Sequence, residues 1–185
     1  ALTTQDGVLV KTGATTRRYI GSFYASAANQ TEDSFAKRFV WNYYNRVVSV
    51  MRVLEGTDSW TVTGATLAQA RGSTANQLDF IIGVAESPLS VTVVGCGSGD
   101  SNGAQVIVGV GLDSTTTLAT GQINGQARNG TDANETFVVT AHLDTYPTAG
   151  RHYAVWLEAG TTTVTFRGDD GASLIKTGIS GTAER

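Results

Sequence analysis

The sequence is short of charged side chains. Asp, Glu, Lys and Arg together make up 16% of its 185 residues, whereas an average soluble domain has about 25%. Neutral polar side chains and glycine must therefore cover most of the exterior, which suits a surface shared with copies of itself or presented to neutral sugars. The net charge is −3, and Lys and Arg are scattered along the chain. A basic patch for phosphate groups is thus missing, and we expect no nucleic-acid partner.

Cysteine is almost absent, as are long apolar runs. Cys96 is the single cysteine, so no disulfide forms within the chain. No apolar run is long enough to cross a bilayer, and the N-terminus has no apolar segment of the signal-peptide type. We therefore expect no membrane insertion. The chain begins at Ala1 rather than at Met, so we expect either that an initiator Met is removed or that this is the C-terminal module of a longer chain.

Short segments rich in β-branched and aromatic residues recur along the sequence, and turn residues separate them. About ten to twelve such segments occur, with no long helical pattern. This arrangement predicts an all-β fold, an antiparallel β-sandwich of jelly-roll type, as a single domain over residues 1–185. Besides the central segment described next, the expected strands are residues 8–10, 17–25, 60–63, 77–85, 89–96, 105–112, 136–143, 153–159, 161–166 and 173–177.

The central segment, Lys37 to Val48, has the highest density of large side chains. With a period of two, Phe39, Trp41 and Tyr43 share one face, which favours one half-buried strand running on toward Glu55. A helix is the weaker alternative, because the valines that follow lose side-chain freedom in a helix. We expect the aromatic face to anchor the sandwich core, with an aromatic binding platform as the alternative.

No arrangement of residues predicts a metal site or a nucleophilic enzyme. His142 and Asp144 form an H-x-D pair, and His152 lies ten residues further on, but this spacing matches no compact metal-binding pattern, and Cys96 would have to come from a distant segment. The sequence Gly97-Ser98-Gly99 is too short for the turn that presents a catalytic serine. We therefore expect no catalytic residue, no metal ligand and no cofactor.

Paired carboxylates are the more serious enzyme option. Glycoside cleavage needs two of them about 5–10 Å apart, and the acidic residues in or near expected strands are Asp79, Glu86, Asp113 and Glu158. Sequence alone does not pair them. The stretch from Gly95 to Gly103 is expected to be a glycine-dense loop, and without a lysine and a following helix it does not predict a phosphate site.

Four blocks of the sequence resemble a module of tailed bacteriophages and phage-like particles. These blocks are residues 13–23, 31–47, 54–60 and 72–80, and residues 109–116 and 150–153 fit the same pattern. The likeness runs from about Asp6 to Gly181, and proteins with this module are described as head fibre, spike, decoration or tail fibre proteins. The resemblance implies a homotrimeric β-sandwich on the virion surface, made in the cytoplasm of the bacterial host and in contact with capsid or tail proteins.

Two functional hypotheses follow. The first is a non-enzymatic structural component of the virion surface that assembles with itself and contacts a host-surface polysaccharide. The alternative is a lectin or a glycan-degrading module of a phage spike. For glycan contact the sequence offers two aromatic residues beside carboxylates: Trp60 next to Asp58, and Tyr146 next to Asp144. The plain alternatives are that Trp60 is half-buried in its strand and that Tyr146 packs on Pro147.

Overall fold

The chain folds into β-strands joined by turns. The structure, a computed structural model, describes residues 1–130, 132–169 and 175–185. Within these residues there is no α-helix, and the single helical element is a 3-10 turn, η1, at Ala70–Gly72. The expected all-β class is confirmed. The described strand pairs are antiparallel apart from the parallel pair of β5 with β10.

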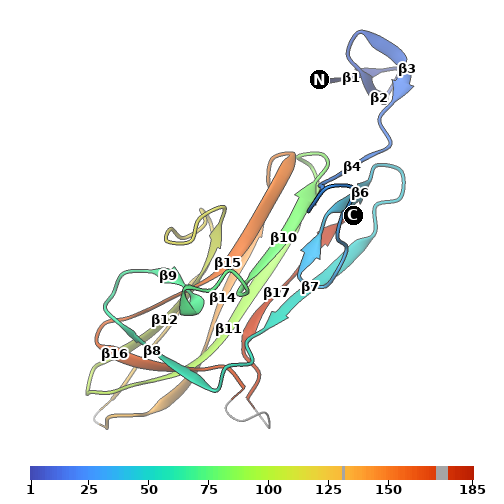
Figure 1. The fold of residues 1–185 in the computed structure, drawn as a ribbon. Helices are drawn as coiled ribbons and strands as arrows, with labels where there is room; N and C mark the ends of the chain where they lie inside the picture. The colour runs from blue at the N-terminus through green and yellow to red at the C-terminus, as the bar shows by residue number, and fades with distance from the viewer. Residues whose placement is uncertain (131, 170–174) are drawn as a thin grey trace.

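Two six-stranded sheets form the body of the molecule (Figure 1). The first has the strand order β13-β12-β15-β10-β5, and β9 also pairs with β15. Its strands are β5 (Lys37–Arg38), β9 (Ala68–Gln69), β10 (Gln77–Ile82), β12 (Gln105–Leu112), β13 (Gly125–Arg128) and β15 (Gly150–Gly160). The second has the order β7-β17-β11-β16-β8, and β14 also pairs with β11. Its strands are β7 (Val48–Leu54), β8 (Ser59–Thr63), β11 (Leu89–Gly99), β14 (Thr136–Thr145), β16 (Thr163–Arg167) and β17 (Gly178–Glu184).

A three-stranded sheet projects from one end of this body and carries the N-terminus (Figure 1). It consists of β1 (Leu2–Gln5), β2 (Val8–Lys11) and β3 (Ala14–Arg18), and a two-stranded sheet of β4 (Gly21–Phe23) and β6 (Val40–Asn42) follows. The expected strand 17–25 is therefore wrong, because the chain passes from one sheet to the other at Tyr19 and Ile20. The Tyr19 amide still donates to Leu9, whereas the Ile20 carbonyl accepts from Tyr43.

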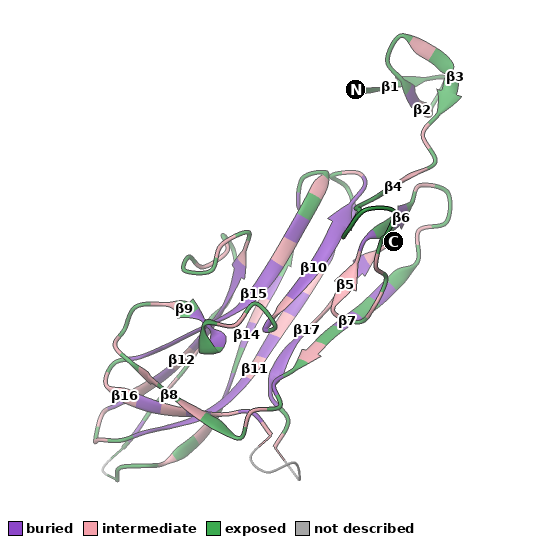
Figure 2. Cartoon of the chain, viewed as in Figure 1, coloured by how far each residue is buried: buried purple, intermediate pink, exposed green. Residues whose placement is uncertain are grey.

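The facing sides of the two large sheets share one hydrophobic core. Trp156 and Phe80 from the first sheet and Phe166 and Met51 from the second are fully buried in it. Alternate residues of the strands point inward, as the pleat requires. Figure 2 shows that the buried residues concentrate along β10, β11 and β15, whereas the N-terminal sheet is mostly exposed.

The central aromatic segment is not one strand. It is divided into β5, β6 and β7. The break between β6 and β7 is a turn, which the Asn42 side chain closes by accepting hydrogen bonds from the amides of Tyr44 (2.9 Å) and Asn45 (3.2 Å). The predicted alternation holds up to this turn, since Phe39 and Trp41 are buried. Trp41, however, packs at the end of the body against Tyr19 and Tyr43, with ring centroids 6.0 and 6.1 Å away. Core packing, rather than an exposed platform, is therefore confirmed for Phe39 and Trp41, but the Trp41 ring lies outside the hydrophobic cluster between the two large sheets.

Two further expectations fail in the second sheet. Residues 95–99 belong to β11 rather than to a loop, since they pair with β14 and β16. The expected strand 173–177 lies partly outside the described residues, and its described part, 175–177, is not a strand. The last strand is β17, which pairs with both β11 and β7. Its alternation is weak because Ser180, Gly181 and Thr182 interrupt the apolar residues.

The position of Trp41 can be tested through Gly83. A Cβ atom at Gly83 would lie 2.0 Å from Cε3 of the Trp41 indole ring, so the ring must move to accept it. We expect Gly83→Ala to lower the free energy of unfolding by about 1–3 kcal/mol. The control is Gly56→Ala, where the new Cβ meets nothing within 4 Å and the effect should stay within about 0.5 kcal/mol. Equal urea midpoints for the two variants would contradict this packing.

Candidate functional site

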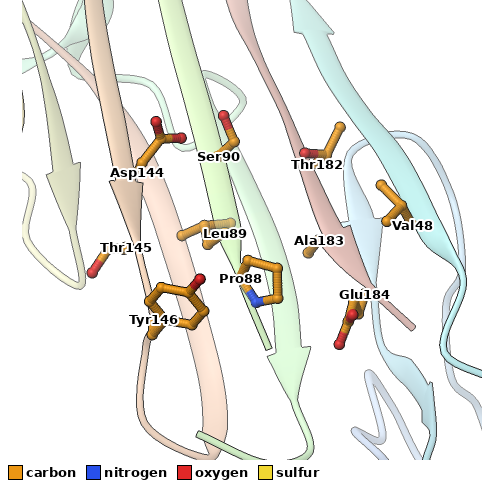
Figure 3. A pocket seen from close by; sticks show the side chains of 10 residues that line it. All are labelled: Val48, Pro88, Leu89, Ser90, Asp144, Thr145, Tyr146, Thr182, Ala183 and Glu184. Carbon is orange, nitrogen blue, oxygen red and sulfur yellow. The ribbon is translucent and has the colours of Figure 1, made fainter. Parts of the chain in front are cut away.

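A groove of about 300 Å³ lies on the outer side of the second sheet (Figure 3). It is lined by Val48, Pro88, Leu89, Ser90, Asp144, Thr145, Tyr146, Thr182, Ala183 and Glu184. Strand register explains how distant segments meet there: Ser90 on β11 is opposite Asp144 on β14 and also opposite Thr182 on β17. Directly opposed residues point to the same face of a sheet. One row across three strands therefore presents a carboxylate and two hydroxyl groups.

One end of the groove is aromatic and apolar. Figure 3 shows Tyr146 close to Leu89 and Pro88, with Asp144 and Ser90 further along the strands. Tyr146 is 67% exposed, whereas the following Pro147 is buried. The phenol ring is thus accessible from solvent. An aromatic ring beside a carboxylate and hydroxyl groups is a surface on which a sugar ring can stack and hydrogen-bond.

Asp144 is held in its ionised form by neighbours on the same face. Its Oδ2 lies 2.9 Å from Nε2 of His142, and Nδ1 of that ring lies 3.0 Å from the Thr92 hydroxyl. The hydrogen bond from His142 lowers the pKa of Asp144, and one from Ser90 lowers it further. Glu184 adds a second carboxyl group, and among the described residues that line the groove there is no Lys, Arg or His. The groove therefore disfavours anionic ligands.

The second pair of candidate residues, Trp60 and Asp58, lies elsewhere. Trp60 on β8 is opposite Phe166 on β16, which in turn is opposite Gly97 on β11. Gly97 lies seven positions after Ser90 along β11, a distance of about 23 Å at the usual rise per residue of a strand. The structure therefore brings Tyr146 and Asp144 together in one groove and places Trp60 and Asp58 outside it.

The Trp60 side chain is engaged inside the molecule. Its ring stacks on Phe166 at a centroid distance of 5.9 Å and meets Trp156 edge-on at 5.7 Å. Its Nε1 donates to Oε1 of Glu158 at 2.8 Å. Trp60 does line a cleft of about 410 Å³ together with Arg71 and Glu158, but Asp58 does not. Of the two alternatives for Trp60, the structure agrees with a half-buried strand residue rather than with an exposed platform for a sugar.

The acidic residues considered as a catalytic pair are each engaged by another group of the chain. Asp79 accepts a hydrogen bond from Arg151, Glu86 from Arg46, and Asp113 lies 2.7 Å from Nδ1 of His152. Both ring nitrogens of His152 are engaged, since Nε2 lies 2.8 Å from the Thr148 carbonyl oxygen. Within the part of the chain that the structure describes, no group of three or more His, Cys, Asp or Glu side chains could hold a metal ion.

Glu158 instead belongs to a buried polar network that sequence reasoning missed. Besides Trp60, the backbone amide of Arg71 donates to its Oε1 at 2.8 Å. Glu55, at the end of β7, accepts hydrogen bonds from Arg71 Nη1 (2.8 Å) and Asn76 Nδ2 (2.7 Å). In the sequence, Glu55 and Asn76 lie in two of the four blocks that resemble the phage module, residues 54–60 and 72–80. Nothing in those blocks shows that they meet.

The two buried carboxyl groups differ in their ionisation. Burial raises the pKa of Glu158 to about 7, and the nearby charge of Glu55 adds to this rise. Burial acts on Glu55 in the same direction, but the hydrogen bonds from Asn76 and Thr57 and the charge of Arg71 outweigh it and lower its pKa. Glu55 is thus a carboxylate at neutral pH, whereas Glu158 is partly protonated.

No model of a known protein family matches the chain, and no curated protein sequence matches it. Among the described residues, no helix has the length and apolar character needed to span a membrane.

Proposed function

We propose that the chain is a structural component of the surface of a phage or phage-like particle, built as a jelly-roll sandwich that assembles as a homotrimer. The resemblance of its sequence blocks to virion fibre, spike and decoration proteins supports the assignment to a particle. In this proposal the groove beside Tyr146 contacts a host-surface polysaccharide, and the chain binds other capsid or tail proteins. The chain has no enzymatic role and needs no cofactor.

The main support for self-assembly is the exposed apolar side chains on the outer side of β7, which is the edge strand of the second sheet. Val48, Val50 and Leu54 are 63, 54 and 51% exposed, and we call them the β7 face. The exposed ring of Phe35 lies beside them, because the Arg52 amide donates to the Phe35 carbonyl at 2.8 Å. Arg52 lies on the same face between Val50 and Leu54, and its guanidinium lies over the Phe35 ring. Exposed apolar side chains gathered at a sheet edge are typical of an interface between proteins. A closed ring of three copies would cover this face on every copy.

The groove supports glycan contact because its lining is aromatic and hydroxyl-rich, and because none of its described lining residues is Lys, Arg or His. A neutral sugar ring can stack on Tyr146 while its hydroxyl groups donate to Asp144. Single grooves of this kind bind weakly, but many copies on one particle raise the overall avidity by about 10²–10⁴. Weak contact therefore suffices for attachment to a cell surface.

The assignment to a particle is tested by cryo-electron microscopy of particles that carry the protein. We expect density for three copies at each surface site, on the capsid or on the tail. Particles that lack the protein should assemble but adsorb more slowly to the host. If particles that lack the protein adsorb at the normal rate, the attachment role is contradicted and a purely structural role remains. If the chain is absent from purified particles, both roles are contradicted.

Self-assembly is tested by sedimentation equilibrium. We expect the wild-type chain at micromolar concentration to show three times its monomer mass of 19.4 kDa. Val50→Lys places a charge on the β7 face near Arg38 and Arg52 and should shift the protein to monomers. The matched control is Val138→Lys on β14, where the valine is 70% exposed away from the β7 face, and it should remain trimeric. A wild-type monomer would contradict the proposal.

The role of the groove is tested with a single ring deletion. Tyr146→Ala should reduce binding of the oligomer to neutral oligosaccharides on a glycan array by about tenfold, the equivalent of ~1.4 kcal/mol. Tyr44→Ala is the control, because Tyr44 is similarly exposed, at 58%, but does not line the groove. Equal losses in the two variants, or preferred binding to acidic glycans, would contradict a neutral-sugar site at Tyr146.

A further inference from the structure

Glu158 connects the two sheets at one end of the core. It lies on β15, next to Ala68 of β9 on the neighbouring strand, and it is 2% exposed. Its Oε1 accepts from Trp60, which belongs to β8 in the other sheet, and from Arg71, which belongs to η1. One carboxyl oxygen therefore joins three elements: β15, β8 and η1. We call the contact of β8 and η1 with β15 the Glu158 seam.

The other oxygen of Glu158 has no partner. Within the described structure Oε2 is buried and accepts no hydrogen bond. An ionised carboxylate carries charge on both oxygens, whereas the protonated acid leaves only a neutral hydroxyl group without a partner at Oε2. A buried carboxylate with one empty oxygen costs more free energy than the neutral acid at the same place. The geometry of the Glu158 seam therefore suits the protonated form.

The two charges near Glu158 act in opposite directions. Among the described residues the charged groups that face it are Glu55, from the end of β7, which favours the neutral acid, and Arg71, from η1, which favours the carboxylate. β8, β9 and β12 contain no charged residue in their described spans. The Arg71 guanidinium is bound to Glu55 and to the hydroxyl of Thr57 rather than to Glu158. Burial and the empty Oε2 therefore outweigh its attraction.

The backbone at Arg71 shows that η1 is held by these contacts. Its φ angle is 57°, a left-handed conformation that is unfavourable for a non-glycine residue. The Arg71 amide reaches Glu158 and the Arg71 side chain reaches Glu55 in this conformation. Loss of the bond to Glu158 removes one of the two restraints that keep η1 against β15.

We propose that Glu158 is a proton-controlled latch: in its neutral form it holds β8 and η1 on β15, and opening of the Glu158 seam releases its proton. The seam is thus tight in acid and loosens toward neutral pH. Loosening would widen the cleft of about 410 Å³ that Trp60, Arg71 and Glu158 line. This device is independent of the virion role and of the groove at Tyr146.

The sign of the pH dependence follows from linkage. The pKa of Glu158 is about 7 in the closed seam and near the ordinary 4.5 once the seam is open. Below pH 4.5 both forms carry the proton, and the stabilisation of the closed form is complete. Between these two pKa values the opening constant rises about tenfold per pH unit, and above the higher one it levels off.

The first experiment uses the wild-type chain and the indole N–H signal of Trp60 in ¹H–¹⁵N spectra. Because Trp60 Nε1 donates to Glu158, this signal should shift with pH with a midpoint near 7. The indole signal of Trp41 is the internal control, since its buried Nε1 atom has no acceptor in the described structure and its ring packs against Tyr19 and Tyr43, and it should not follow that midpoint. A Trp60 signal that does not titrate between about pH 5.5 and 8.5 overturns the proposal.

The second experiment measures hydrogen exchange of the Arg71 amide, corrected for the intrinsic rate at each pH. Its protection should fall roughly fortyfold between pH 5 and pH 7 in the wild type, because both pH values lie close to one of the two pKa values. Glu158→Gln keeps a neutral side chain that can accept from Trp60 and Arg71, so its protection should be the same at both pH values. Glu86→Gln is the control, an exposed carboxyl group paired with Arg46, and it should behave as the wild type.

Two results contradict the latch. One is equal protection of the Arg71 amide at pH 5 and pH 7 in the wild type. The other is the same fall in protection in Glu158→Gln as in the wild type. If Glu158→Gln does not fold, the titration of the Trp60 indole signal in the wild type decides.

Discussion

The arrangement of the two sheets depends on the close approach of β11 to the first sheet. A Cβ atom on Gly95 would lie 2.8 Å from Cγ1 of Val108, and one on Gly99 would lie 2.2 Å from Cβ of Ala104. Side chains at these two positions would force the sheets apart where β11 and β12 pack together. Because the glycines leave room there, Val108 and the large ring of Trp156 fill the space between the sheets. The rest of the core is built outward from this contact.

The same glycines explain the main error of the sequence-based fold. Alternation of apolar and polar residues located β8 and β14 closely, because the pleat imposes a period of two. Short apolar runs located β10 and β12, whose residues are mostly buried on both faces. In residues 95–99 the sequence shows only a high density of glycine. Such a density is equally typical of a loop and of a strand whose backbone packs closely against another. Local sequence does not distinguish these cases. The partner that requires the missing side chains lies on another strand.

The candidate site could be predicted only in part, for a related reason. Asp144 and Tyr146 are two residues apart, so the sequence placed them together. Ser90 and Thr182 complete the groove through the register of β11 with β14 and β17, which no local pattern reveals. Trp60 was chosen for the same local reason as Tyr146, but its ring faces Phe166 and Trp156. The proximity of an aromatic ring to a carboxylate in sequence therefore does not decide which side of the sheet the ring occupies.

Glu55 and Glu158 show how strongly hydrogen-bond donors decide the state of a buried carboxyl group. Both lie close to Arg71, and burial favours the neutral form of each. Glu55 has donors on both oxygens, from Arg71 and Thr57 on Oε1 and from Asn76 on Oε2. Glu158 has donors on Oε1 alone. Burial dominates at Glu158, whose second oxygen has no donor in the described structure, and raises its pKa. At Glu55 the donors on both oxygens outweigh burial and lower the pKa, so that its carboxylate anchors Arg71 and Asn76.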